Sequence, residues 1–200
     1  MRKLLPVLFL LLACHSQVPN LDSPGKTIVC LGDSITAGVG SGPGEAYPEL
    51  LAARLGTEVI NEGVSGDTAA QGLARVDQVL ADEPWMVIVE LGGNDILRQV
   101  PPEQTERSLR QILDHLLSAR VVPVLVAVDA PLGAAYKEIY GRLGDEYHVP
   151  VVDDAIGKVL RDRSLKSDTV HPNAAGQKVI AEEIADEIAP ILKARRRRAA

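Results

Sequence analysis

The apolar residues of this chain follow two patterns that alternate from residue 27 to the C-terminal region. Short runs rich in Val, Ile and Leu are typical of buried β-strands, and they occur at Thr27–Leu31, Glu58–Asn61, Met86–Leu91, Val121–Val128 and Val149–Val152. Longer segments with apolar residues at every third or fourth position indicate amphipathic helices, and they occur at Pro48–Leu55, Thr68–Leu80, Thr105–Ala119, Ala134–Tyr147 and Asn173–Leu192. Because this alternation favours a parallel sheet with helices on both faces, we expect a three-layer α/β/α domain of about five strands over residues 27–192.

The N-terminal region has a different pattern. Arg2 and Lys3 precede the apolar run Leu4–Ala13, which at about ten residues is too short to span a bilayer of about 30 Å. A basic start and a short apolar core are typical of a secretory signal peptide. The run ends in Leu-Leu-Ala-Cys, which resembles the lipobox of bacterial lipoproteins, in which the cysteine receives lipid.

We therefore expect a signal peptide (1–13), a lipid on Cys14 and a tether to the domain (14–26). An ordinary signal peptide with an incidental Cys14 is the alternative. Either reading places the protein in the bacterial cell envelope or outside the cell, and a lipid would hold it at the periplasmic face of a membrane. His15 after the cysteine resembles a signal for sorting to the outer membrane.

The composition fits one globular domain. The 200 residues are 46% hydrophobic and 24% charged, which is enough for a sizeable core. A net charge of −6 and an aromatic content of 3% argue against nucleic acid as a partner. The tail (193–200) contains the basic run Arg195–Arg198, for which we expect a solvated end, with contact to anionic lipid headgroups as the alternative. Cys30, in the first predicted strand, is expected to be a small buried hydrophobe.

A serine follows the first predicted strand directly, in Gly32-Asp33-Ser34. Ligands of open α/β sheets bind at the carboxyl ends of the strands, so Ser34 lies where chemistry is expected. A serine needs a base to act as a nucleophile near neutral pH. His171 is the best candidate, because Asp168 precedes it by three residues in a segment that Pro172 keeps out of a helix. A carboxylate on one ring nitrogen leaves the other to accept a proton, although a capping Asp and a surface His would leave the same pattern.

Two glycine-rich loops follow the second and third predicted strands, over Asn61–Asp67 and Glu90–Asp95. Fixed N–H donors that point at a developing oxyanion stabilise it by about 3–4 kcal/mol each. Gly63 and Asn94 could supply such donors at the sheet edge that carries Ser34. Asp33 and Asp95 adjoin these segments, and we expect them to make structural hydrogen bonds rather than to catalyse or bind a metal.

Together, four blocks resemble the SGNH (GDSL) hydrolase family, in the family's order and within residues 27–192. The blocks are Gly32-Asp33-Ser34, Gly63, Gly92-Gly93-Asn94-Asp95 and Asp168-Thr169-Val170-His171. The longer runs Val64–Thr68 and Val89–Asp95 resemble the branch of bacterial arylesterases, lysophospholipase L1 and acyl-CoA thioesterase I. The resemblance implies a flavodoxin-like sheet, no metal and no cofactor.

The resemblance also implies a role for each residue. Ser34 would be the nucleophile, His171 the base and Asp168 the residue that orients the base. The oxyanion hole would combine the N–H of Ser34, the N–H of Gly63 and the side chain of Asn94. The motif around Ser34 is not Gly-x-Ser-x-Gly, so the nucleophile elbow of α/β-hydrolases is not the template.

The function implied is hydrolysis of carboxylic esters or thioesters through an acyl-enzyme, with aryl esters and lysophospholipids among the substrates. The segment Asp129–Val149 looks shorter than in long-chain thioesterases of the family, which favours short or medium acyl chains. A carbohydrate O-deacetylase of the same family is one alternative. Others are an FMN-binding or a non-catalytic flavodoxin-like module, since fold alone does not define function. Partners would be a small ester or lipid and, through the anchor, a membrane.

Overall fold

The computed structural model describes residues 18–129 and 134–199, and in them five strands form one sheet in the order β2-β1-β3-β4-β5. All the pairs are parallel. The strands are β1 (Thr27–Gly32), β2 (Val59–Gly63), β3 (Pro84–Glu90), β4 (Val122–Val126) and β5 (Val151–Val152). This strand order is the flavodoxin-like one, so the predicted fold class is confirmed.

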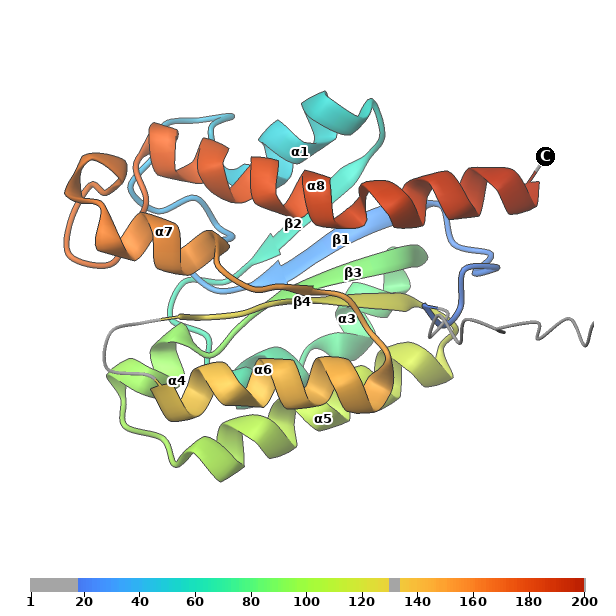
Figure 1. Ribbon diagram of the computed structural model, residues 1–200, viewed down its shortest axis with the longest axis horizontal. Helices are drawn as coiled ribbons and strands as arrows, with labels where there is room; N and C mark the ends of the chain where they lie inside the picture. The colour runs from blue at the N-terminus through green and yellow to red at the C-terminus, as the bar shows by residue number, and fades with distance from the viewer. Residues whose placement is uncertain (1–17, 130–133, 200) are drawn as a thin grey trace, which may run out of the picture.

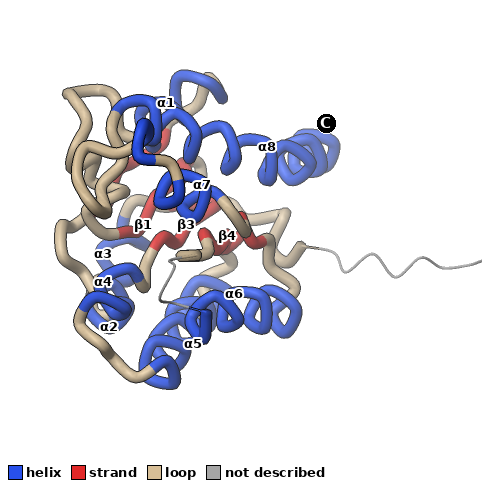
Figure 2. The backbone as a smooth tube through the Cα atoms, turned by 60° about the vertical axis from the view of Figure 1, so that its left-hand side comes forward, coloured by secondary structure: helices blue, strands red, loops and turns tan. Residues whose placement is uncertain are grey.

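Helices cover both faces of the sheet, as Figure 1 shows. One layer contains α1 (Tyr47–Leu55), α7 (Ala155–Arg161) and α8 (Ala174–Ala199). The other layer contains α2 (Ala69–Leu73), α3 (Val76–Ala81), α4 (Gly93–Leu97), α5 (Pro102–Ser118) and α6 (Ala134–Tyr147). A single 3₁₀ turn, η1 (Arg163–Leu165), follows α7. Figure 2 shows the sheet between these two layers. In Figure 1, α4 and α7 lie on the side toward which the arrows of β1 and β2 point.

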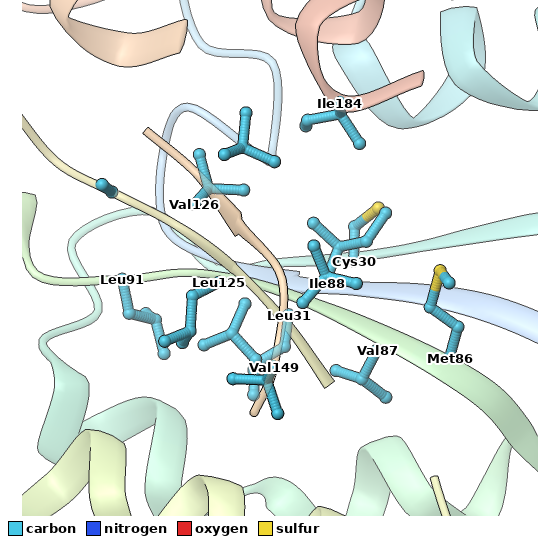
Figure 3. Packing of buried hydrophobic residues seen from close by; sticks show 14 of the residues in the cluster. Cys30, Leu31, Met86, Val87, Ile88, Leu91, Leu125, Val126, Val149 and Ile184 are labelled. Atoms are coloured by element: carbon cyan, nitrogen blue, oxygen red, sulfur yellow. The ribbon is translucent and has the colours of Figure 1, made fainter. Parts of the chain in front are cut away.

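The core lies on both faces of the central strands. Side chains of one strand alternate between the two layers: Cys30, Ile88 and Val126 face the layer of α8, where Ile184 packs, whereas Leu31 points to the opposite layer (Figure 3). Every residue of β3 is buried, as expected for a parallel strand covered on both sides. Cys30 has no exposed surface, which confirms its predicted place in the core.

Several elements differ from the prediction. The helix expected over 68–80 is broken between Leu73 and Val76. At the break, the guanidinium of Arg75 donates to Asp67 Oδ2 at 2.7 Å and to the carbonyl of Gly32 at 2.9 Å. A straight helix would point this side chain elsewhere, so long-range contacts determine the break. The short helices α4 and α7 were not predicted, and the fifth strand is shorter than the run that predicted it.

The two ends of the domain also differ from expectation. The part of the predicted tether that the structure describes packs on the domain: Asn20 donates to the carbonyls of Leu117 and Val121 at 3.0 and 3.1 Å, and Leu21 is buried. Helix α8 continues through the basic run to Ala199, whereas the pattern predicted its end at Leu192. The predicted signal peptide and Cys14 lie outside the described residues. No helix in the described ranges is long and apolar enough to span a membrane.

Candidate active site

Ser34 lies two residues beyond the end of β1, in a series of turns at the carboxyl edge of the sheet. Its Oγ is 3.1 Å from Nε2 of His171, which is 137 positions away in sequence. The Nδ1 of His171 is in turn 2.7 Å from Oδ2 of Asp168. The three residues predicted as nucleophile, base and orienting acid are therefore brought together in a hydrogen-bonded line.

The loop that carries Asp168 and His171 is held by its own backbone. Asp168 Oδ1 accepts hydrogen bonds from the amides of Val170 and His171, each at 2.8 Å. The amide of Ser167 donates to the carbonyl of His171 at 2.9 Å. The hydrogen bond with the His171 ring, and next those from the amides of His171 and Val170, hold the pKa of the Asp168 carboxyl well below its usual range. The carboxylate therefore stays ionised beside the imidazole, although it is half exposed.

The turn around Ser34 is fixed by its neighbour Asp33 and by Gly63. Asp33 Oδ1 accepts from the amide of Ile35 at 2.9 Å. The backbone of Gly63 packs so closely on this turn that a Cβ there would lie 2.2 Å from the amide nitrogen of Ala37. Any other residue at position 63 would displace the turn that carries Ser34. The glycine is thus required by contact between two backbones.

Two of the three predicted oxyanion donors have hydrogen-bond partners in this structure. The amide of Gly63 donates to Asn61 Oδ1 at 3.0 Å. Asn94 Nδ2 donates to Asp33 Oδ2 at 2.9 Å and to the carbonyl of Asp67 at 3.0 Å. The amide of Ser34 has no acceptor within the described ranges. The Ser34 amide is therefore available as it stands, whereas the other two would have to exchange partners.

A pocket of about 280 Å³ opens beside Ser34 and His171. Ser65, Gly66, Gly93 and Asn94 form part of its wall, and the other lining residues are mostly apolar. The apolar residues are Ile35, Ile96, Leu97, Val128, Ile156, Leu160 and Val170. Gly63 is not among the residues that line it.

The apolar lining was missed by the sequence analysis. Much of it comes from α4 and α7, the two short helices that the hydrophobic pattern did not reveal. The signal in the sequence is short: the adjacent pair Ile96 and Leu97 in α4, and Ile156, Val159 and Leu160 at helical spacing in α7.

Three other polar residues that could have been catalytic, Asp95, His115 and His148, do not line the pocket of Ser34. Asp95 is buried, and its carboxylate accepts from the amide of Ala69 at 2.9 Å and from the Thr105 hydroxyl at 2.8 Å, so its predicted structural role is confirmed. His115 is exposed on α5, and His148 lines a larger open groove between α6 and α8. Neither lines the pocket of Ser34. The larger groove contains no nucleophile with a base, so its size does not make it the reactive site.

Comparison with known proteins agrees with this geometry. Residues 30–179 match the model of the GDSL-like Lipase/Acylhydrolase family. The chain belongs to this family. The predicted SGNH family and its hydrolase activity are thereby confirmed, and the FMN-binding alternative loses its support.

This hydrolase is 37% identical over 198 residues to the thioesterase 1/protease 1/lysophospholipase L1 of Escherichia coli (strain K12), which covers 94% of this chain and 93% of that protein. It is 31% identical to the esterase TesA of Pseudomonas aeruginosa over 84% of this chain and 90% of that protein. A crystal structure of TesA superimposes with a TM-score of 0.78 at 30% identity, covering 83% of this chain and 99% of that one.

Proposed function

We propose that this hydrolase is a serine esterase that cleaves short- or medium-chain carboxylic esters or thioesters through an acyl-enzyme. The observation that carries the proposal is the line from Ser34 Oγ to His171 Nε2 and from His171 Nδ1 to Asp168, at 3.1 and 2.7 Å. A hydroxyl, a ring nitrogen and a carboxylate in this order form a nucleophile whose proton has an acceptor.

The reaction has two halves. Ser34 Oγ attacks the carbonyl carbon while His171 Nε2 takes its proton, and the Asp168 carboxylate stabilises the resulting imidazolium. The tetrahedral intermediate collapses, and the alcohol or thiol leaves with the proton from His171. Water then attacks the acyl-enzyme with His171 again as the base, and the acid is released as Ser34 regains its proton.

The oxyanion of each tetrahedral intermediate would be stabilised by the amide of Ser34 and by Asn94. Asn94 now donates to the neutral carbonyl of Asp67, which is a weaker acceptor than an oxyanion. We expect this N–H to turn to the oxyanion, or to be shared with it, while the bond to Asp33 holds the amide in place. Gly63 would take part only if its amide left Asn61.

The size of the pocket beside Ser34 favours substrates with an acyl group of limited length. Its volume of about 280 Å³ lies just below the range for small-molecule sites, about 300–1,000 Å³. Its wall is apolar where it meets α4 and α7, as an acyl chain requires. Aryl esters and lysophospholipids remain substrate classes to test.

The proposed location is the cell envelope, with the protein anchored through lipid on Cys14. The lipobox-like sequence supports it, and so does the position of residues 18–26, which lead into the sheet at the end opposite Ser34. Cys14→Ser should move the protein from the membrane fraction to the soluble fraction of cells. Unchanged membrane association would contradict the anchor.

Hydrolysis of p-nitrophenyl esters graded in acyl length tests the activity. Ser34→Ala and His171→Ala should each abolish it, whereas His115→Ala, an exposed histidine on α5, should retain it. We expect activity to peak at short or medium chains and to fall for palmitate. Equal activity in Ser34→Ala and the parent protein would refute the proposal, and preference for acetylated sugars over these esters would instead favour the carbohydrate deacetylase.

A further inference from the structure

The end of the sheet opposite Ser34 carries a concentration of positive charge. We call it the basic pole and define it by Lys26, Lys193, Arg195, Arg196 and Arg197. All but Arg195 are exposed, and they face solvent on a chain whose net charge is −6. Figure 1 shows the C-terminus of α8 on the side from which the strands start, away from α4 and α7.

Arg195 fixes this pole to the domain. Its Nη1 donates to the carbonyl of Ser23 at 2.9 Å, and its Nη2 donates to that of Gly25 at 2.8 Å. The guanidinium carbon also lies 4.4 Å from the ring centroid of Trp85, in a cation–π contact. Because these bonds join the last turns of α8 to the segment that enters β1, the neighbouring cations are held in place.

A pocket of about 330 Å³ separates the cations of α8 from Lys26. It is lined by Lys26, Leu55, Gly56, Thr57, Trp85, Leu192, Arg195 and Arg196. This pocket has cations on two sides and a partly apolar floor. Such a lining can bind a phosphate group that has an alkyl chain attached. Of the acids at this end of the sheet, Asp22 is paired with Arg120 at 2.6 Å, whereas Glu58 and Glu83 are exposed beside the start of β1 and offset part of the positive charge.

We propose that the basic pole docks on the anionic headgroups of a phospholipid membrane and so turns the pocket of Ser34 away from the bilayer. Charge complementarity carries the choice of partner, since each Lys or Arg near an anionic leaflet strengthens binding about fivefold. The docking requires neither the lipid on Cys14 nor catalysis by Ser34, although an anchor at that end would add to it.

Vesicle sedimentation tests the docking. The chain from residue 14 with Cys14→Ser contains every residue that the structure describes and lacks a lipid. It should bind vesicles with 30 mol% phosphatidylglycerol at least tenfold better than pure phosphatidylcholine vesicles, and less at high salt. The triple variant Lys193→Gln, Arg196→Gln, Arg197→Gln should lose at least tenfold. The matched triple variant Arg107→Gln, Lys158→Gln, Arg163→Gln, at exposed cations that do not line this pocket, should not.

Three outcomes of the vesicle assay would overturn the docking. They are equal binding to both kinds of vesicle, unchanged binding by the triple variant, and complete competition by 10 mM inorganic phosphate at constant ionic strength. The last result would indicate a site for free phosphate. Tight binding to mixed-sequence duplex DNA without vesicle binding would also overturn it.

A second inference concerns Glu90, a buried carboxyl behind the reactive serine. Glu90 ends β3 and has no exposed surface. Its Oε2 accepts from the Thr36 hydroxyl at 2.9 Å. Its Oε1 is buried and has no hydrogen-bond partner within the described residues. Glu90 pairs with Gly32 across β3 and β1, which brings its carboxyl beside that of the next residue, Asp33, a second buried acid. Two buried carboxyls in contact cannot both be ionised.

A proton on Oε1 of Glu90 resolves this contact, because the acid can then donate to Asp33. The opposite arrangement fits less well, since both oxygens of Asp33 already accept, from the amide of Ile35 and from Asn94 Nδ2. Burial, and next the charge of Asp33, raise the pKa of Glu90 well above its ordinary value.

We infer that Glu90 is a positioning residue: as a neutral acid it donates to Asp33, and Asp33 holds both the turn of Ser34 and the amide of Asn94. The inference rests on the proposed function, because it assigns Glu90 an effect on that site. Glu90 touches neither substrate nor the reacting atoms and acts through Asp33.

Two substitutions separate this role from a purely structural one. Glu90→Gln keeps a donor toward Asp33 and should retain kcat within about threefold, whereas Glu90→Leu should lower kcat at least tenfold with little change in KM. The parent should also lose activity at alkaline pH, where Glu90 ionises, and Glu90→Gln should lose less. Equal losses in the two variants would refute a neutral donor.

The pH dependence of unfolding provides a readout that does not involve activity. If the parent chain and Glu90→Gln unfold with the same pH dependence, Glu90 is not a neutral acid. If Ser34→Ala is active but these unfolding curves differ, the proposed function fails while the protonation of Glu90 stands.

Discussion

The two ends of the sheet differ in how the hydrogen bonds of their polar groups are satisfied. At the carboxyl end, N–H donors are available to a ligand. Asn94 donates to a neutral carbonyl, which an oxyanion can replace, and the amide of Ser34 has no acceptor within the described ranges. At the amino end, Arg195 is held by backbone carbonyls and by Trp85. The first arrangement can bind a developing charge, whereas the second fixes the ends of the chain.

The parallel sheet explains why the two ends divide in this way. All carboxyl ends of the strands meet at one edge, so the loops with Ser34, Asn94 and Gly63 converge there. The amino ends receive the segments that enter the strands, and the contacts of Arg195 hold the segment that enters β1 in place. The comparison therefore predicts that substitutions at the carboxyl end change turnover, while those at the amino end change stability.

Asp168→Asn should have the largest effect on turnover. Without the carboxylate, the His171 tautomer is no longer set for accepting a proton, and we expect kcat to fall by about 10³–10⁴-fold with KM nearly unchanged. Steady-state ester hydrolysis measures both constants. Asp162→Asn, in the neighbouring loop, is the matched control and should stay within about twofold. A large rise in KM with unchanged kcat would mean that Asp168 serves binding.

Asn94→Ala should follow, with a fall in kcat of about 10²–10³-fold, because removal of one oxyanion donor costs about 3–4 kcal/mol in the transition state. Asn61→Ala is the control, since it removes the acceptor of the Gly63 amide and leaves Asn94 intact. If Asn94→Ala keeps kcat within threefold, the Asn94 amide remains on Asp67 during the reaction, and the exchange of partners does not occur.

Arg195→Ala should lower the free energy of unfolding by roughly 2–3 kcal/mol, because charged hydrogen bonds and a cation–π contact are lost together. Urea denaturation measures this, and kcat/KM should not change. The matched control is Arg54→Ala, whose bridge to Asp186 is largely exposed and should be worth less than about 1 kcal/mol. If Arg195→Ala lost activity without losing stability, the prediction that the amino end of the sheet serves stability and the carboxyl end serves turnover would be wrong.

Glu90→Gln should change the pH dependence of stability. A carboxyl whose pKa is raised on folding binds more protons in the folded state, so its contribution to stability falls as pH rises above about 4.3, by at most about 1.4 kcal/mol per pH unit. The glutamine variant lacks this slope, and its advantage should grow from pH 5 to pH 8. Urea denaturation at several pH values gives the comparison.

Other titratable groups face this pair, and burial raises the pKa of Asp33 itself to about 6. Cys30, Tyr47 and Tyr140 lie in the electrostatic field of Glu90, and His171 lies in that of Asp33. Burial raises the pKa of Cys30, Tyr47 and Tyr140, so these three groups stay protonated from pH 5 to pH 8 and add no slope to the difference between the parent and the variant. A parent chain that becomes more stable as pH rises, relative to the variant, would show that Glu90 is ionised in the fold.

The sequence by itself determined the strands, most of the helices and the reactive residues. Apolar runs and helical spacing are local, so they predicted β1 and α6 without knowledge of their neighbours. Ser34 and the Asp168–His171 pair were recognised because their chemistry requires particular residue types. Family membership confirms the fold that these signals implied, while the role of each site residue stays a prediction.

Only the tertiary structure decided what each residue touches. Nothing local in the sequence shows that Glu90 meets Asp33, that Asn94 donates to Asp67, or that Arg195 reaches Gly25. These contacts join segments that are distant along the chain, and they exist because strands and helices pack in one arrangement. Hydrophobic periodicity indicates which face of a helix or strand is buried, but it does not indicate which other element packs against that face.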